Sequence, residues 1–452
     1  MSAGPEFLAL AERALEVARK EAPGLSVEIY AARGRERALE RKEGRPEQLI
    51  ESAEEGLGLR LSDGGRMAFV CGGGLTPERA ADLARRAKAQ LPLMPVDPAR
   101  VLPGPLTAPL PEGLAESLRD DEAFKSPLAE LAPRLDAAAA AARRAHKGVN
   151  KILHAGFSES FSEVAIVSSS GTRAYERGSS AGVGFSMAAS SGAELQVGSG
   201  SRAARRASDL DWDSAACDAA FRAAALVGAK KLPGKKRDIL FDPWVASDVL
   251  DLLAGPLSAE AVQRGRSLLK GRLGKRVASA AVTLVDDPHR LGGLGSALFD
   301  DEGLPTRRKV MVERGVLRSY FYDAYTAARD GVASNASASR GGYRGLPGPS
   351  PTNLVLMPGK MSRAELLKDT RDGILVFEIM GMHTADPVSG ELSVGISGVA
   401  VRRGEITHGI KGAMLSTHAL KLFGAVDAVA DDLVSYGSLS APTFRAAGLQ
   451  VS

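Results

Sequence analysis

The chain has 452 residues, more than a single hydrophobic core usually supports, so two or three domains are expected. Its 44% hydrophobic and 25% charged residues are ordinary for a soluble globular protein and exclude a disordered or collagen-like chain. The formal net charge of +4, from 58 basic and 54 acidic residues, indicates no polyanionic partner, and the 5% aromatic content argues against a stacking platform for single-stranded nucleic acid.

The first 90 residues show an α+β pattern. Apolar periodicity and turn residues predict a helix over 6–21, strands over 25–31, 54–61 and 66–71, and a helix over 76–90. Seven prolines then fall between residues 91 and 112, where neither a helix nor a central strand can persist. We therefore expect an N-terminal α+β subdomain over 1–90 and a semi-rigid linker over 91–112.

A second α+β subdomain is expected over 113–233. Its pattern predicts helices over 127–146 and 212–227, with antiparallel strands over 152–158, 163–168, 173–192 and 194–200. Two basic clusters, 202–206 and 230–237, lie beside small or turn residues. We expect solvated loops there, because a phosphate-binding face needs more concentrated charge.

The remaining residues, 234–452, predict a β-rich C-terminal domain with a few helices. A helix is expected to begin at Asp242-Pro243, because Asp caps helices and Pro suits the first helical position. Strands are expected over 238–241, 278–285, 309–312, 317–321, 373–380, 392–403 and 406–409, with a long loop over 333–353. The fold class is thus α+β, with an N-terminal α/β sandwich-like region of mainly antiparallel sheets.

The stretch 286–303, DDPHRLGGLGSALFDDEG, concentrates His, Gly, Ser and acidic residues in one turn-rich segment. One hypothesis is a binding loop whose backbone amides approach a ligand. The alternative, which the composition favours, is a hairpin connection with a solvated acidic end at 300–302.

Strong catalytic signatures are missing from the sequence. None of the six histidines is followed by Glu, so there is no helical zinc-protease pair, and neither a Gly-x-Ser-x-Gly elbow nor a phosphate-binding loop occurs. His383 follows a predicted buried strand, where it can serve as a base or ligand contact. The alternative is a loop histidine bonded to the backbone.

Cysteine usage and hydropathy bear on the compartment. Two cysteines, Cys71 and Cys217, are too few for a disulfide framework, and no signal-peptide core precedes the charged first helix. No apolar run approaches the length of a membrane span. We expect a soluble cytoplasmic protein without membrane or nucleic-acid partners.

Several segments together resemble the TldD/PmbA family. They occur in the family's order and spacing over most of residues 230–452: 286–303, Tyr322–Arg329, the turn at 352–354, 373–376, and Pro387–Gly398 with its sequence PVSGELSVGISG. The N-terminal parts carry weaker signatures of the same family.

The resemblance implies one of two subunit types. In this family one subunit is a metallopeptidase with a His-Glu-x-x-x-His helix and a later Cys ligand, and the other, called TldE or PmbA, lacks these residues and partners it. Here the corresponding helix has the sequence DPWVASDVL over 242–250, and Met380 to His383 stand where the Cys-bearing loop is expected. The resemblance therefore implies the non-metal-binding subunit, with zinc in the partner and an unfolded peptide as substrate.

This interpretation assigns no catalytic residue, metal or cofactor to the chain itself. The expected contacts in the substrate cleft are Met380, His383, His289, Gly292 and Gly293. The alternative is a self-contained enzyme or ligand-binding homodimer that uses His289 or His383 with nearby carboxylates. A homodimer is also possible for the subunit in isolation.

Overall fold

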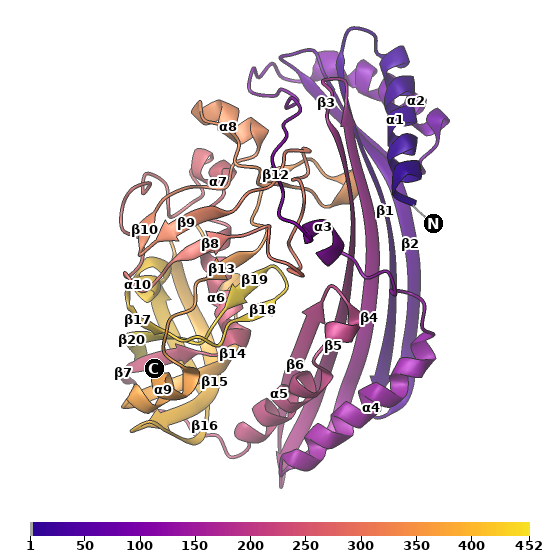
Figure 1. Ribbon diagram of the computed structural model, residues 1–452. Helices are drawn as coiled ribbons and strands as arrows, with labels where there is room; N and C mark the ends of the chain where they lie inside the picture. Colours follow the sequence, from indigo (N-terminus) through magenta and orange to yellow (C-terminus); the bar gives the residue numbers. More distant parts are fainter. Residues whose placement is uncertain (1–2) are drawn as a thin grey trace.

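One antiparallel sheet of six strands runs through the N-terminal half of the chain (Figure 1). The computed structural model describes residues 3–452. The strand order is β3-β2-β1-β4-β5-β6, and the strands are β1 (Ser26–Lys42), β2 (Arg45–Ser62), β3 (Met67–Gly73), β4 (Val149–Ser168), β5 (Arg173–Ser191) and β6 (Glu194–Ala204). Because β1 pairs with β4 from Glu28–Ser168 to Arg41–Ala155, strands from 1–90 and 113–233 share this sheet.

The strands are longer than the sequence predicts. β4 is one strand of 20 residues where two short strands were expected over 152–158 and 163–168. Residues 159–162 pair with β1 on one side and β5 on the other, so the intervening polar residues do not interrupt the strand. Glu159 and Phe161 face one side of the sheet and Ser160 and Ser162 the other.

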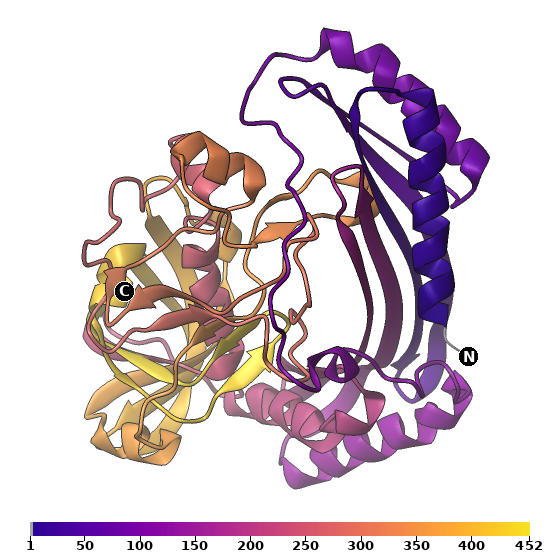
Figure 2. The same cartoon turned by 45° about the horizontal axis from the view of Figure 1, so that its top comes forward.

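Two helix pairs cover the ends of the outer face of this sheet (Figure 2). α1 (Ala3–Glu21) and α2 (Pro77–Gln90) enclose one apolar core with the sheet, and α4 (Leu128–Ala145) and α5 (Trp212–Ala225) enclose another. α5 approaches β6 closely, since a Cβ added at Gly200 would lie 2.2 Å from the Ala215 carbonyl oxygen. Glycine at this position is therefore required by packing.

The proline-rich segment crosses between the two halves of the molecule. After η1 (Leu91–Leu93) it forms no helix or strand until α3 (Leu114–Ser117), as its prolines predict. The Asp97 amide donates to the Gly65 carbonyl at 2.7 Å, and the Asp97 carboxylate accepts from the Tyr325 hydroxyl at 2.8 Å. The segment is thus fastened to the N-terminal sheet and to the C-terminal domain.

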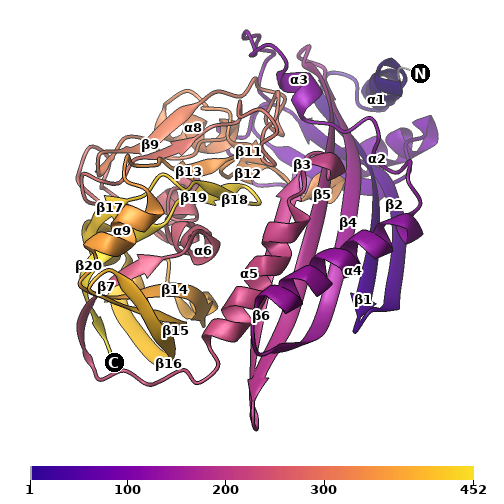
Figure 3. The ribbon, with the colours of Figure 1, turned by 60° about the horizontal axis from the view of Figure 1, so that its bottom comes forward.

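The C-terminal domain contains two six-stranded sheets and a two-stranded ladder. The first, ordered β16-β15-β14-β7-β20-β17, consists of β7 (Lys235–Phe241), β14 (Asp372–Met380), β15 (Glu391–Arg402), β16 (Glu405–His418), β17 (Val426–Val429) and β20 (Phe444–Val451). β16 also pairs with β20 at Leu415–Val451, so this sheet curls back on itself. Figure 3 shows the segment after α5 passing β16, where the Lys230 amide donates to the Gly409 carbonyl, before the chain enters β7.

The second sheet is ordered β10-β9-β8-β13-β19-β18. Its strands, followed by those of the small ladder, are β8 (Leu284–Asp286), β9 (Lys309–Glu313), β10 (Val316–Leu317), β13 (Leu354–Leu356), β18 (Val434–Tyr436), β19 (Leu439–Ala441), β11 (Ala338–Ser339) and β12 (Gly348–Pro349). Only two of these strand pairs, β7 with β14 and β13 with β19, are parallel within the described residues. The α+β class with mainly antiparallel sheets and a β-rich C-terminal domain is confirmed.

Short helices complete this domain. They are α6 (Pro243–Ala254), α7 (Ala259–Gln263), α8 (Ala324–Asp330), α9 (Arg363–Asp369) and α10 (Ala419–Gly424). The predicted start of α6 is confirmed, because the Asp242 side chain accepts from the Trp244 amide at 3.1 Å and Pro243 opens the helix. Within residues 3–452, no helix is long and apolar enough to cross a lipid bilayer.

Two predicted strands are shorter than expected. Of the expected 278–285 only residues 284 and 285 lie in a strand, and of the expected 317–321 only residue 317 does. The Ala278 amide donates to the Gly315 carbonyl and the Ser279 amide to the Phe423 carbonyl, so this backbone is bonded to loops and not to a neighbouring strand. Such long-range partners cannot be derived from local pattern.

Candidate functional site

The stretch 286–303 lies at the joint between the N-terminal sheet and the C-terminal domain. Arg205, just after β6, donates to the carbonyl oxygens of Gly293, Leu294 and Ser296 at 3.0, 2.8 and 2.8 Å. The expectation of a solvated basic loop is therefore wrong for Arg205. Its guanidinium satisfies three carbonyl oxygens of the loop and fixes the loop's position on the sheet.

The glycines of this stretch serve backbone packing. A Cβ added at Gly295 would lie 2.1 Å from the Thr352 carbonyl oxygen, and Gly292 has a φ of +69°. The amide of Gly293 donates to the Arg290 carbonyl at 3.0 Å, and that of Gly295 to the Asn353 side chain at 2.9 Å. These two amides are thus bonded within the protein.

His289 is also held inside the joint. Its Nε2 lies 3.0 Å from the carbonyl oxygen and 3.2 Å from the hydroxyl of Thr306. The ring nitrogen bonded to a backbone carbonyl acts as donor, which assigns the proton of a neutral imidazole to Nε2. His289 therefore lies with Gly292 and Gly293 in the joint.

The acidic end of the stretch is buried, so the expected solvated turn is wrong. Asp300 and Glu302 are only 4% and 2% exposed. Glu302 pairs with Arg60 of β2 at 2.9 Å, and Asp301 accepts from the Tyr30 hydroxyl at 3.1 Å. Burial, together with the charge of Glu302, raises the pKa of Asp300 to about 8. These carboxylates connect the C-terminal domain to the N-terminal sheet.

His383 lies in a different place, on a cavity of about 570 Å³ in the C-terminal domain. The cavity is bordered by the C-terminal half of α6 and by the residues around η4 (Met382–Thr384). Its polar lining consists of His383 and three carboxylates, Asp248, Asp251 and Asp386, beside apolar residues such as Leu252 and Leu439. Neither Lys nor Arg lines it.

The electrostatics of this cavity differ from one carboxylate to the next. Burial and the neighbouring Asp251 raise the pKa of Asp248. Hydrogen bonds from the Val388 amide and from Ser389 lower the pKa of Asp386. No hydrogen-bond partner of the His383 imidazole is found among residues 3–452, and the side chain is exposed.

The five predicted cleft residues do not form one cluster. Met380, at the end of β14, is 50% exposed and packs against Gly395 instead of lining the cavity of His383. Sequence reasoning missed Asp248 and Asp251. The signal for them was their spacing of three residues on one face of an otherwise apolar helix.

The donors around the cavity do not fit a zinc ion. Protein zinc sites use three or four His, Cys, Asp or Glu ligands at close range. No group of three such side chains that could hold a metal ion occurs in the described part of the chain, residues 3–452. Of the residue types that bind zinc, the helix after β7, α6, supplies only Asp248 and Asp251 to the cavity.

Three models of one family match successive parts of the chain. They are the PmbA/TldA metallopeptidase domain 1 over residues 27–91, the central domain over 121–227 and the C-terminal domain over 234–452. A metalloprotease of Methanocaldococcus jannaschii is 33% identical over 221 residues, 48% of this chain and 48% of the relative. Metalloprotease PmbA of Escherichia coli O157:H7 is 27% identical over 252 residues, 54% of this chain and 53% of that protein. The match thus spans about half the length of these relatives.

Solved structures share the fold over nearly the whole chain. A candidate modulator of a DNA gyrase from Thermotoga maritima has a TM-score of 0.88 and 27% identity, covering 99% of this chain and 100% of its own. TldE from Thermococcus kodakarensis has a TM-score of 0.84 and 19% identity, covering 98% and 100%. Since all three family domains follow one another in order, the chain belongs to the PmbA/TldD family of metallopeptidases.

Proposed function

We propose that this chain is the non-metal-binding subunit of a TldD/TldE-type zinc metallopeptidase. The observation that carries the proposal is the His383 cavity of a domain of metallopeptidase type, where, as elsewhere in residues 3–452, no three His, Cys, Asp or Glu side chains are grouped closely enough to hold zinc. The zinc then belongs to a partner that carries a His-Glu-x-x-x-His helix. The zinc held by that partner would supply the metal-activated water for cleavage of the peptide.

The role of this chain is to complete the partner's cleft. An unfolded peptide is held there in extended form, where backbone pairing supplies affinity without demanding a particular sequence. Met380 and His383 are the proposed contacts, because both are exposed at the surface of the C-terminal domain. His289, Gly292 and Gly293 act indirectly by holding the joint that positions this domain. The complex is proposed to be cytoplasmic.

Co-expression with a His-Glu-x-x-x-His candidate partner tests this proposal. We expect a one-to-one complex on size-exclusion chromatography, chelator-sensitive cleavage of an unfolded peptide, and about one zinc per complex. The matched control is a partner in which the motif Glu is replaced by Gln, which should still form the complex and should not cleave.

The same experiment addresses the self-contained enzyme or homodimer. Chelator-sensitive hydrolysis by this chain alone, with about one tightly bound zinc, contradicts the proposal. Metal-independent turnover by the chain alone that is lost on His383→Ala also contradicts it and favours a site built from His383 and its neighbouring carboxylates.

A further inference from the structure

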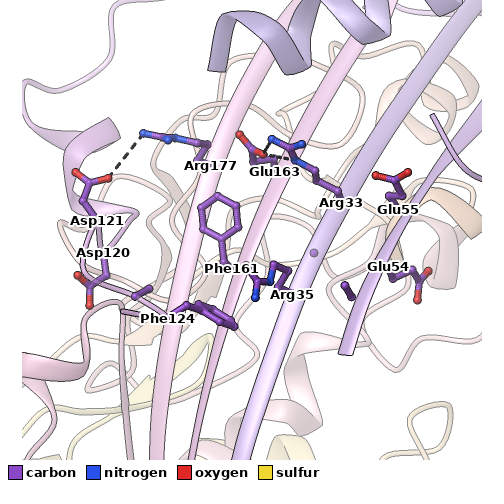
Figure 4. A pocket seen from close by; sticks show the side chains of 13 residues that line it. Arg33, Arg35, Glu54, Glu55, Asp120, Asp121, Phe124, Phe161, Glu163 and Arg177 are labelled. Carbon is purple, nitrogen blue, oxygen red and sulfur yellow. Dashed lines mark hydrogen bonds and ion pairs between the residues drawn. The ribbon is translucent and has the colours of Figure 1, made fainter. Parts of the chain in front are cut away.

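A cavity of about 590 Å³ lies on the outer face of the N-terminal sheet, between the two helix pairs (Figure 4). This face carries the odd-numbered side chains of β1, including Arg33 and Arg35, and those of β4, including Phe161 and Glu163. Pockets of 300–1,000 Å³ are typical of small-molecule sites. The opposite face, with Tyr30 and Arg60, contacts the C-terminal domain.

The segment after α3 forms a fixed wall of the cavity. Phe124 has a φ of +65°, which is rare for a bulky residue and persists only where the surroundings hold it. Its amide donates to Glu159 at 3.3 Å, and its ring centroid lies 5.0 and 4.9 Å from the guanidinium carbons of Arg35 and Arg37. The wall therefore does not depend on a ligand.

The inner charges of the cavity are already paired. Glu163, whose side chain is fully buried, pairs with Arg33 and accepts from the Tyr175 hydroxyl. Glu159 pairs with Arg37, and both side chains are largely buried. Buried pairs of this kind are costly to separate, so these groups are not available to a ligand.

The outer charges are loosely held. Arg35 meets Glu51 at 3.1 Å with both side chains more than half exposed, and Arg177 meets Asp121 only at 3.8 Å. The exposed pair of Arg35 contributes little stability, and the pair of Arg177 is long and has a 68% exposed partner, so both arginines can exchange their partners for a ligand's charge. Glu55 has no ion-pair partner within residues 3–452, and the Phe161 ring lies between Arg35 and Arg177 (Figure 4).

We propose that this cavity binds a short zwitterionic peptide of two or three residues. Its carboxylate pairs with the loosely held arginines, its ammonium group pairs with Glu55, and an apolar side chain packs on Phe161. A ligand of one charge sign would leave either the arginines or Glu55 without a new partner. The site lies on the face turned away from the C-terminal domain and does not depend on a zinc-bearing partner.

Titration calorimetry on the full chain alone tests the proposal. We expect saturable binding of alanyl-phenylalanine, and at least tenfold weaker binding of its N-acetyl and its C-amide forms, because each has lost one charge-assisted contact. Arg177→Gln and Glu55→Gln should weaken binding of the free dipeptide by a similar factor. Glu47→Gln, an exposed charge change elsewhere on β2, is the matched control and should bind as the natural chain does.

Several results would overturn the proposal. The proposal is wrong if the chain shows no saturable binding of alanyl-phenylalanine, or if it binds the N-acetyl and free dipeptides with equal affinity. It is also wrong if Arg177→Gln and Glu55→Gln both bind the free dipeptide as tightly as the natural chain does. Thermal unfolding of each variant confirms that the fold is retained, and Glu55→Gln keeps the test valid if Arg177→Gln unfolds, because Glu55 is exposed. Failure here leaves the peptidase-subunit proposal untouched, since the co-expression assay does not involve this cavity.

Discussion

Replacing Arg60 by methionine lowers the free energy of unfolding by about 3–5 kcal/mol, because two buried carboxylates lose their shared guanidinium. Arg60 donates from Nε to Glu28 at 2.8 Å and from Nη1 to Glu302 at 2.9 Å. All three side chains are less than 5% exposed. After the substitution Glu28 retains Arg340 at 2.6 Å, whereas Glu302 loses its ion pair across the joint.

The measurement is urea-induced unfolding of the natural chain and the variant. Arg85→Met is the matched control, because Arg85 of α2 pairs with Glu21 at 3.0 Å but is 58% exposed, and such pairs contribute about 0–1 kcal/mol. The rate of amide hydrogen exchange in residues 286–303 should rise in Arg60→Met and stay unchanged in Arg85→Met. Equal stability losses in the two variants would show that the joint does not depend on this buried pair.

Replacing Glu176 by glutamine flattens the pH dependence of stability between about pH 4.5 and 8. Glu176 of β5 accepts from the Leu298 amide at the joint, and burial raises its pKa from 4.5 to about 7. A carboxyl whose folded-state pKa is raised stabilises the fold below its unfolded pKa, and this stability is lost as the pH rises through the folded pKa. The natural chain should therefore lose about 3 kcal/mol from this group over that range.

Urea unfolding of both proteins at several pH values measures the effect. Glutamine keeps a carbonyl oxygen that can accept from the Leu298 amide. Because it does not ionise, the free energy of unfolding of the variant should rise relative to that of the natural chain as the pH increases above 7. Asp300 titrates in both proteins and cancels in the comparison. A difference that stays constant from pH 5 to pH 8.5 would contradict burial of an ionisable Glu176, and the exposed substitution Glu47→Gln serves as control.

The candidate site was predictable only in part. The sequence indicated His383 because a histidine after an apolar strand stands out, and the structure places it on a cavity. Asp248 and Asp251 join it there because α6 and the residues around η4 pack together, although about 130 residues separate them in the sequence. His289 gave an equally strong signal, yet Thr306 holds its imidazole inside the joint.

Local patterns in the chain suffice to predict the α+β class, most helix positions and the family, because these depend on apolar periodicity, caps such as Asp242, and ordered motifs. The role of the stretch 286–303 follows only from its contacts in the folded chain. The sequence predicted solvated acids because local composition carries no information on distant partners, and Arg60 and Tyr30 come from strands more than 200 residues away. Those long-range ion pairs and hydrogen bonds make a segment whose composition favoured a hairpin connection the joint between the two halves of the molecule.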